Sequence, residues 1–200
     1  MIPHHATTWV RQGLDRYIIN FYYATYQVGI FSFALNAANI IEMIGIAFNS
    51  TNSVTIFKTL SNKDLNNQEK KEKLEKQTRL IGTIYFAAAI VVMISMSCIT
   101  LVALPKYKDS IPYIWILSVS AFLKCVYFLY CNYFFYFSKT KLLMYITFGT
   151  SVLHLLLSLV LTQYSLLYTA LIYVIIQLVT DIIVYINSKK ILKKEINEHI

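Results

Sequence analysis

The chain has 200 residues, of which 57% are hydrophobic and only 14% are charged, and its mean hydropathy is +0.55. A soluble domain does not carry so apolar a composition, so we expect the protein to lie in a membrane. The formal net charge of +8 comes from Lys and Arg residues that stand between apolar runs. That placement argues against a nucleic-acid-binding domain, which needs a basic face with base-stacking aromatic side chains.

Apolar runs divide the chain into transmembrane segments. A helix needs about 20 apolar residues to cross a bilayer. Five runs meet this length: Val28 to Phe48, Leu80 to Ala103, Tyr113 to Phe137, Leu142 to Leu161 and Leu166 to Ile186. A weaker run covers residues 2–20, where Arg11, Asp15 and Arg16 would each cost a few kcal/mol at mid-depth. We expect it to cross only when neighbouring helices shelter it. The sequence thus predicts an all-α, polytopic membrane helix bundle of about six transmembrane helices, forming a single domain over residues 1–200.

Basic residues mark one side of this bundle. The loop 58–79 contains seven Lys and Arg residues, and its Glu/Lys pairs spaced i,i+4 predict a helical segment above the membrane. The turn 138–141 and the tail 187–200 are also basic, whereas the opposite connections contain only Lys106 and Lys108. The positive-inside rule therefore predicts that both termini are cytoplasmic. This requires an even number of crossings and supports counting the weak first run.

Three cations fall within the predicted spans: Arg11, Arg16 and Lys124. Lipid cannot solvate them, so they should face the bundle interior or a water-filled cavity. Cations in such a cavity could bind an anionic phosphate or pyrophosphate group. The alternative is that they form internal ion pairs, such as Arg11 with Asp15, and hold helices together without any substrate.

Three carboxylates, Asp15, Glu42 and Asp181, and one imidazole, His154, accompany these cations. A buried carboxylate can carry a proton or bind a hard cation through oxygen, and a buried histidine can relay protons. These four residues are therefore candidates for coupling-ion sites. Neutralisation of a nearby Lys or Arg, or a hydrogen-bonded helix contact, is the alternative for each.

The sequence carries no catalytic signature. It lacks HExxH, GxSxG and P-loop motifs, and the predicted connections opposite the basic side are too short to build an active site. Cys98, Cys125 and Cys131 fall within apolar runs without metal-binding spacing, which is typical of reduced packing residues. We expect no enzyme activity, no catalytic residues, no bound metal and no cofactor.

Several passages carry a family resemblance. The opening IPHHATTWVRQGLDRYII, the segment VGIFSFA over residues 28–34, the stretch 127–175 and its basic turn SKTK resemble the C-terminal half of the polysaccharide flippases. These flippases are the O-antigen and lipid-linked oligosaccharide branch of the MATE-like exporter superfamily. In that comparison residues 2–19 are similar to the seventh helix, and residues 127–175 to the tenth to twelfth helices.

The resemblance implies one lobe of a MATE-like transporter in the bacterial inner membrane. Such a protein moves undecaprenyl-pyrophosphate-linked oligosaccharide between leaflets by alternating access, for assembly of O-antigen or another surface polysaccharide. Arg11, Arg16 and Lys124 would then hold the pyrophosphate or acidic sugars. The family has two six-helix lobes, so we expect a truncated half that works with a second lobe or a second copy. Its partners would be the lipid-linked oligosaccharide, membrane lipids and other polysaccharide assembly proteins. A drug or cation antiporter of the same superfamily and a non-transporting assembly component are the alternatives.

Overall fold

The computed structural model describes residues 13–197, with side chains described through Lys194. Its regular structure is helical throughout these residues, with no strand, which confirms the predicted all-α membrane bundle. A helix over residues 13–22 comes first. It is followed by α2 (Thr25–Ser61), α3 (Asn67–Val102), the 3-10 helix η1 (Pro105–Ser110), α4 (Ile111–Tyr136), α5 (Thr140–Leu161) and α6 (Leu166–Asn197).

Five of the described helices, α2 to α6, are long and apolar enough to cross a bilayer. The protein is therefore a multi-pass membrane protein. The weak first run predicted over residues 2–20 lies mostly outside the described residues. Its described part, residues 13–20, belongs to the helix 13–22.

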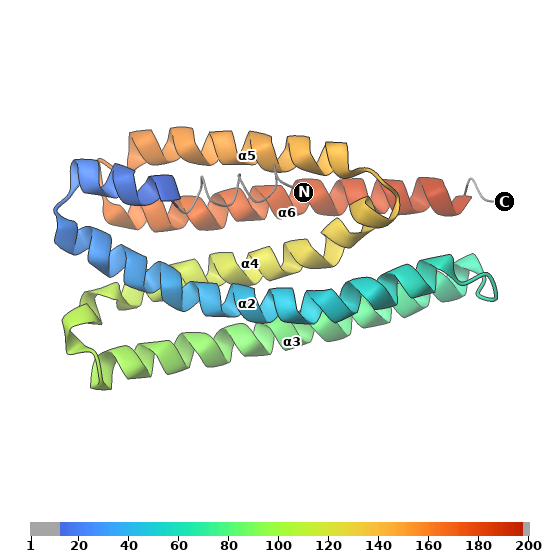
Figure 1. Ribbon diagram of the computed structural model, residues 1–200, viewed down its shortest axis with the longest axis horizontal. Coiled ribbons are helices and arrows are strands. Elements are labelled where there is room, and N and C mark those ends of the chain that lie inside the picture. Colours follow the sequence, from blue (N-terminus) through green and yellow to red (C-terminus); the bar gives the residue numbers. More distant parts are fainter. Residues whose placement is uncertain (1–12, 198–200) are drawn as a thin grey trace.

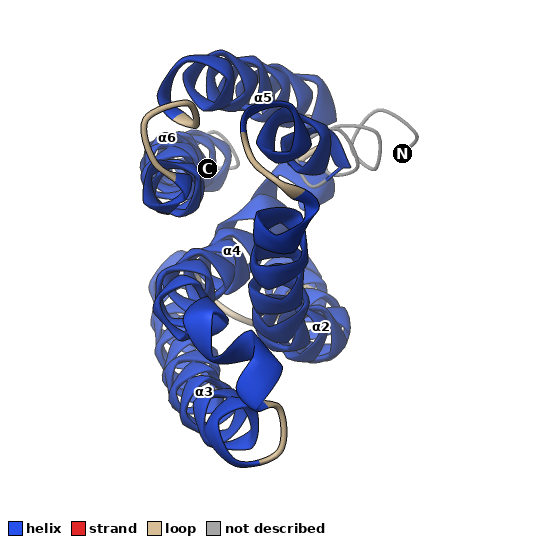
Figure 2. Ribbon diagram, turned by 90° about the vertical axis from the view of Figure 1, so that its left-hand side faces the viewer, coloured by secondary structure: helices blue, strands red, loops and turns tan. Residues whose placement is uncertain are grey.

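The helices lie roughly along one direction, and the connections gather at two ends of the molecule (Figure 1). We call one end the basic end; it contains the turns 62–66 and 137–139 and the C-terminal part of α6. The opposite end contains residues 23–24, the segment 103–110 with η1, and the turn 162–165. Helix α4 packs against α2, α3 and α6, while α5 packs chiefly against α6 (Figure 2). Helices α2, α4 and α6 all run toward the basic end. Moving the same number of residues forward on any two of them therefore covers the same distance along the bundle.

The predicted loop 58–79 is helical except at its turn. Helix α2 continues to Ser61, and α3 starts at Asn67, so only residues 62–66 leave the helical conformation. The Asn66 side chain accepts a hydrogen bond from the Glu69 backbone N–H, and the Glu69 carboxylate accepts one from the Asn66 N–H. This capping box satisfies two backbone donors and fixes the start of α3.

Small residues allow α2 and α4 to approach closely. Gly45 faces Cys125, and the Tyr85 hydroxyl of α3 donates to the Gly45 carbonyl over 3.1 Å. Ala34, Ala37 and Ala38 extend this small-residue surface along α2, and all three are buried. Close backbone approach at small residues is a common way for helices to associate where lipid removes the usual hydrophobic driving force.

Helix α5 has a buried face that is mostly polar. Its buried side chains are Leu143, Thr147, Thr150, Ser151, His154 and Ser158. The hydroxyls of Thr147, Thr150 and Ser151 donate to carbonyl groups one turn back in the same helix, so they need no partner on another helix. The exposed face instead carries large apolar side chains such as Phe148 and Leu156. A helix that hides polar groups and exposes apolar ones is suited to lipid surroundings.

Candidate functional site

A deeply buried polar contact joins the helix 13–22 to α5. His154 Nε2 lies 2.8 Å from Asp15 Oδ2, and each residue is only 1% exposed. The ring of Tyr173 on α6 meets the imidazole edge-on, with 4.7 Å between the ring centroids. His154 lies near the middle of the apolar run 142–161, so the contact is close to mid-depth. Within the described residues the imidazole Nδ1 has no hydrogen-bond partner.

A second contact links α2 to α4. Lys124 Nζ lies 2.5 Å from Glu42 Oε1, with the two side chains 21% and 16% exposed. About two turns closer to the basic end, the Asn132 amide donates to Asn49 Oδ1 over 2.8 Å. The two pairs join α2 and α4 with nearly the same separation in residue number. The two helices therefore keep the same register over this length. The ion pair of Glu42 and Lys124 is only partly covered by protein.

The third carboxylate belongs to α6. Asp181 Oδ1 accepts a hydrogen bond of 2.8 Å from the Gln177 amide one turn earlier, and both residues are largely buried. Helix α4 packs against both α2, which carries Glu42, and α6, which carries the buried Asp181.

The predicted cations do not share one place in the structure. Lys124 is in the interior, whereas Arg16 is exposed on the surface of the helix 13–22. Arg11, and therefore the alternative pairing of Arg11 with Asp15, lies outside the described residues. The structure brings together Lys124 with Glu42, and Asp15 with His154. In both contacts a predicted site residue lies against a partner that can neutralise it or form a hydrogen bond with it, as the alternative interpretation expects.

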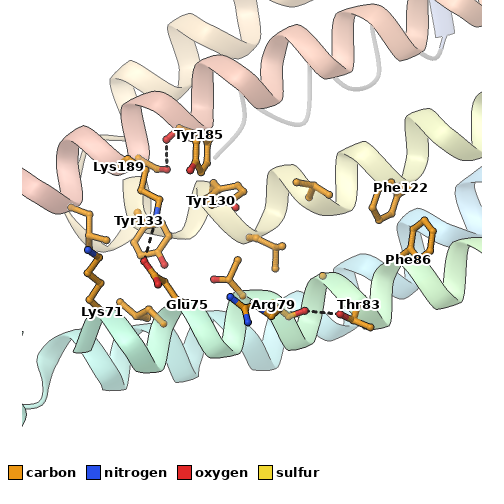
Figure 3. Close-up of a pocket in the computed structure, with 17 residues that line it drawn as sticks. Lys71, Glu75, Arg79, Thr83, Phe86, Phe122, Tyr130, Tyr133, Tyr185 and Lys189 are labelled. Atoms are coloured by element: carbon orange, nitrogen blue, oxygen red, sulfur yellow. Dashed lines mark hydrogen bonds and ion pairs between the residues drawn. The ribbon is translucent and has the colours of Figure 1, made fainter. Parts of the chain in front are cut away.

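Sequence reasoning missed a groove between α3, α4 and α6 near the basic end. It has a volume of about 560 Å³, and its lining includes Lys71, Arg79 and Lys189 (Figure 3). From the sequence, membrane topology alone accounts for these cations. The signal that could have identified them is the position of Arg79 directly before an apolar run, combined with tyrosines at matching depth on α4 and α6.

The described residues contain no group of three or more His, Cys, Asp or Glu side chains that could hold a metal ion. Comparison with protein-family models, curated proteins and solved structures finds no match. The resemblance to polysaccharide flippases therefore stays a prediction.

Proposed function

We propose that this chain takes part in translocating a lipid-linked oligosaccharide with a pyrophosphate group across the bacterial inner membrane. The observation that carries the proposal is the partly open ion pair between Glu42 and Lys124 within two membrane-spanning helices. A charged side chain in the hydrocarbon core is costly, and such residues generally mark substrate or ion pathways. If the pair served packing alone, two apolar residues of similar volume would fill the same space at equal or lower free energy.

In this proposal a phosphate oxygen of the substrate replaces the Glu42 carboxylate on Lys124. The exchange keeps the ammonium group paired, so the cation never faces lipid alone. The released Glu42 carboxylate and the buried Asp181 carboxylate on α6 are then the oxygen ligands that a coupling cation would use.

Location and orientation follow from the same proposal. The basic end faces the cytoplasm, as the positive-inside rule requires, and both termini are cytoplasmic. The substrate enters from the cytoplasmic leaflet and leaves toward the periplasm. The chain acts as one lobe, completed by a second copy of itself, and it performs no covalent chemistry.

The test is surface-polysaccharide display in a flippase-null bacterium that expresses this chain. The parent chain should restore display. Both Lys124→Gln and the double variant Glu42→Gln/Lys124→Gln should fall to the level of the empty strain at equal membrane abundance. The double variant is essential because it removes both charges and leaves no unpaired carboxylate to destabilise the fold. Lys193→Gln, a change on the exposed part of α6, is the matched control and should behave as the parent.

Two outcomes would contradict the proposal. A parent chain that inserts normally but gives no display would show that it does not translocate this substrate by itself. Normal display by the double variant would show that the ion pair has no part in transport, which favours a non-transporting component of polysaccharide assembly.

The buried pair of Asp15 and His154 favours a second candidate, a proton-coupled or cation-coupled drug antiporter. A carboxylate and an imidazole in contact near mid-depth can exchange a proton. This candidate expects proton-driven efflux of a cationic dye from inverted vesicles, lost on Asp15→Asn. Absence of efflux in vesicles that contain the parent chain would exclude it.

A further inference from the structure

The groove near the basic end has a charged half and an apolar half (Figure 3). Its charged half lies where α3 and α6 extend past their apolar runs, and it includes Lys71, Glu75, Arg79 and Lys189. Its other half follows α3 and α4 into the apolar region. The volume of about 560 Å³ falls within the range of about 300–1,000 Å³ that is common for small-molecule sites.

The charged half has an excess of cations. Lys189 Nζ lies 3.9 Å from Glu75 Oε1, a long and exposed contact that contributes little. The side chains of Arg79 and Lys71 have no ion-pair partner among the described residues. Three cations against one carboxylate leave a net charge of about +2 at the mouth of the groove.

The apolar half lies alongside the acyl-chain region of one leaflet. Gly82 and Phe86 follow Arg79 along α3, and Phe86 meets Phe122 of α4 edge-on, with 5.7 Å between ring centroids. Phe86 is seven positions after Arg79, which corresponds to about 10 Å along the helix. A ligand that fills the whole groove must therefore be anionic at the membrane surface and apolar about 10 Å deeper.

Buried residues form the bottom of this surface groove, and exposed residues form its rim. Leu129 and Tyr133 of α4 are 3% and 5% exposed and form the floor, whereas Arg79 and Phe86 are exposed at the rim. Gly82 keeps the middle open, because a Cβ there would meet only Leu129, at 3.8 Å. A chain in the surrounding bilayer can thus enter sideways without movement of the helices.

We propose that this groove binds one anionic glycerophospholipid of the leaflet at the basic end. Its phosphate lies between Arg79 and Lys189, and one acyl chain runs past Gly82 to Phe86 and Phe122. Guanidinium groups bind phosphate oxygens in pairs, and cations near the membrane surface attract anionic lipids. The tyrosines at this depth, Tyr130 and Tyr185, place their hydroxyl-bearing rings at the level of the lipid glycerol. The site is separate from the interior pairs, so it does not depend on the transport proposal.

Native mass spectrometry of the full chain, released from nanodiscs, tests this site. The probes are phosphatidylglycerol and phosphatidylcholine with identical acyl chains. The parent should retain one phosphatidylglycerol with a preference of roughly tenfold or more, since each cation near the surface contributes about fivefold. Arg79→Gln/Lys189→Gln should abolish most of that preference. Lys73→Gln/Lys193→Gln removes the same charge from the same two helices outside the groove and should retain it.

A second pair of variants tests the apolar half without changing charge. Gly82→Leu fills the middle of the groove and should displace the lipid, whereas Gly82→Ala, which meets only ordinary contact distances, should leave it bound. Glycerol 3-phosphate, which has the phosphate without acyl chains, should fail to displace phosphatidylglycerol from the parent.

Three results would overturn the proposal. They are equal retention of the two lipids by the parent, parent-like preference in Arg79→Gln/Lys189→Gln, and displacement of the lipid by glycerol 3-phosphate. The first two would show that the cations do not select the ligand. The third would show a phosphate site in which the apolar half has no role.

Discussion

At the scale of single residues, the Asp15–His154 contact allows a direct test of how charge is held in the interior. His154→Leu leaves a carboxylate that is almost fully buried without its hydrogen-bond partner. Removal of one member of a buried pair typically costs about 3–5 kcal/mol, whereas replacement of both by apolar residues can be neutral. We expect His154→Leu to lower the free energy of unfolding in detergent by several kcal/mol, and Asp15→Leu/His154→Leu to recover most of the loss.

The double variant also serves as the internal control. If it were as unstable as His154→Leu, the loss would come from the shape of the imidazole, including its contact with Tyr173, and not from the unpaired carboxylate.

The tight contact at Gly45 gives a second residue-scale prediction. A methyl group added there would overlap Cys125 Sγ and lie 3.2 Å from its Cβ. Overpacking of this kind typically costs about 1–3 kcal/mol. Gly45→Ala should lower the thermal midpoint in detergent, and Gly45→Ala/Cys125→Ala should recover part of the loss. Gly29→Ala, where nothing lies within 4 Å, is the matched control and should not reduce stability. An unchanged midpoint for Gly45→Ala would show that α2 and α4 are less closely packed than the contact implies.

At the scale of helices, the capping box at the start of α3 should govern the order of the α2–α3 turn. Loss of an N-cap side chain costs about 1 kcal/mol. Asn66→Ala should therefore speed amide hydrogen exchange in the first turns of α3. Gln68→Ala removes only an exposed i,i+4 hydrogen bond to Glu72, worth a few tenths of a kcal/mol, and should change exchange little. Equal effects of the two variants would exclude a specific role for the cap.

The sequence was sufficient to predict the five membrane helices α2 to α6, because the number of apolar residues per run reflects bilayer thickness directly. It was less informative about where helices end. The apolar run beginning at Val28 stops at Phe48, yet α2 continues to Ser61 through a polar stretch. Tertiary contacts explain the difference: Ile56 and Leu60 are buried beside Leu74 and Tyr133. These contacts join residues far apart in the chain and leave no local pattern.

Sequence patterns also could not predict which residues pair with the charged side chains. Glu42 and Lys124 are candidates on composition alone, but their pairing depends on the register between α2 and α4. That register is set by contacts such as Asn49 with Asn132 and Gly45 with Cys125. Periodicity within one helix describes its faces and gives no information on its displacement along a neighbour.

At the scale of the whole molecule, the separation of charge between the two ends leads to a prediction of orientation. Lys63 lies in the turn 62–66 at the basic end, and Lys108 lies in η1 at the opposite end. The positive-inside rule places the first in the cytoplasm and the second outside it. In a chain whose three cysteines are replaced by Ala, a membrane-impermeant thiol reagent added to cells with a permeable outer membrane should label Lys108→Cys and spare Lys63→Cys.

Inverted vesicles should show the reverse labelling pattern. This comparison is the control for a cysteine that does not react in either preparation. Lys139→Cys, in the second turn at the basic end, should follow Lys63→Cys in both preparations because two membrane-spanning helices, α3 and α4, separate the two turns. Labelling of Lys63→Cys and Lys139→Cys in cells would place the basic end outside the cytoplasm. A substrate would then have to enter from the other leaflet, and the lipid groove would face that leaflet too. Labelling of only one of the two would mean that α3 and α4 do not both cross the bilayer.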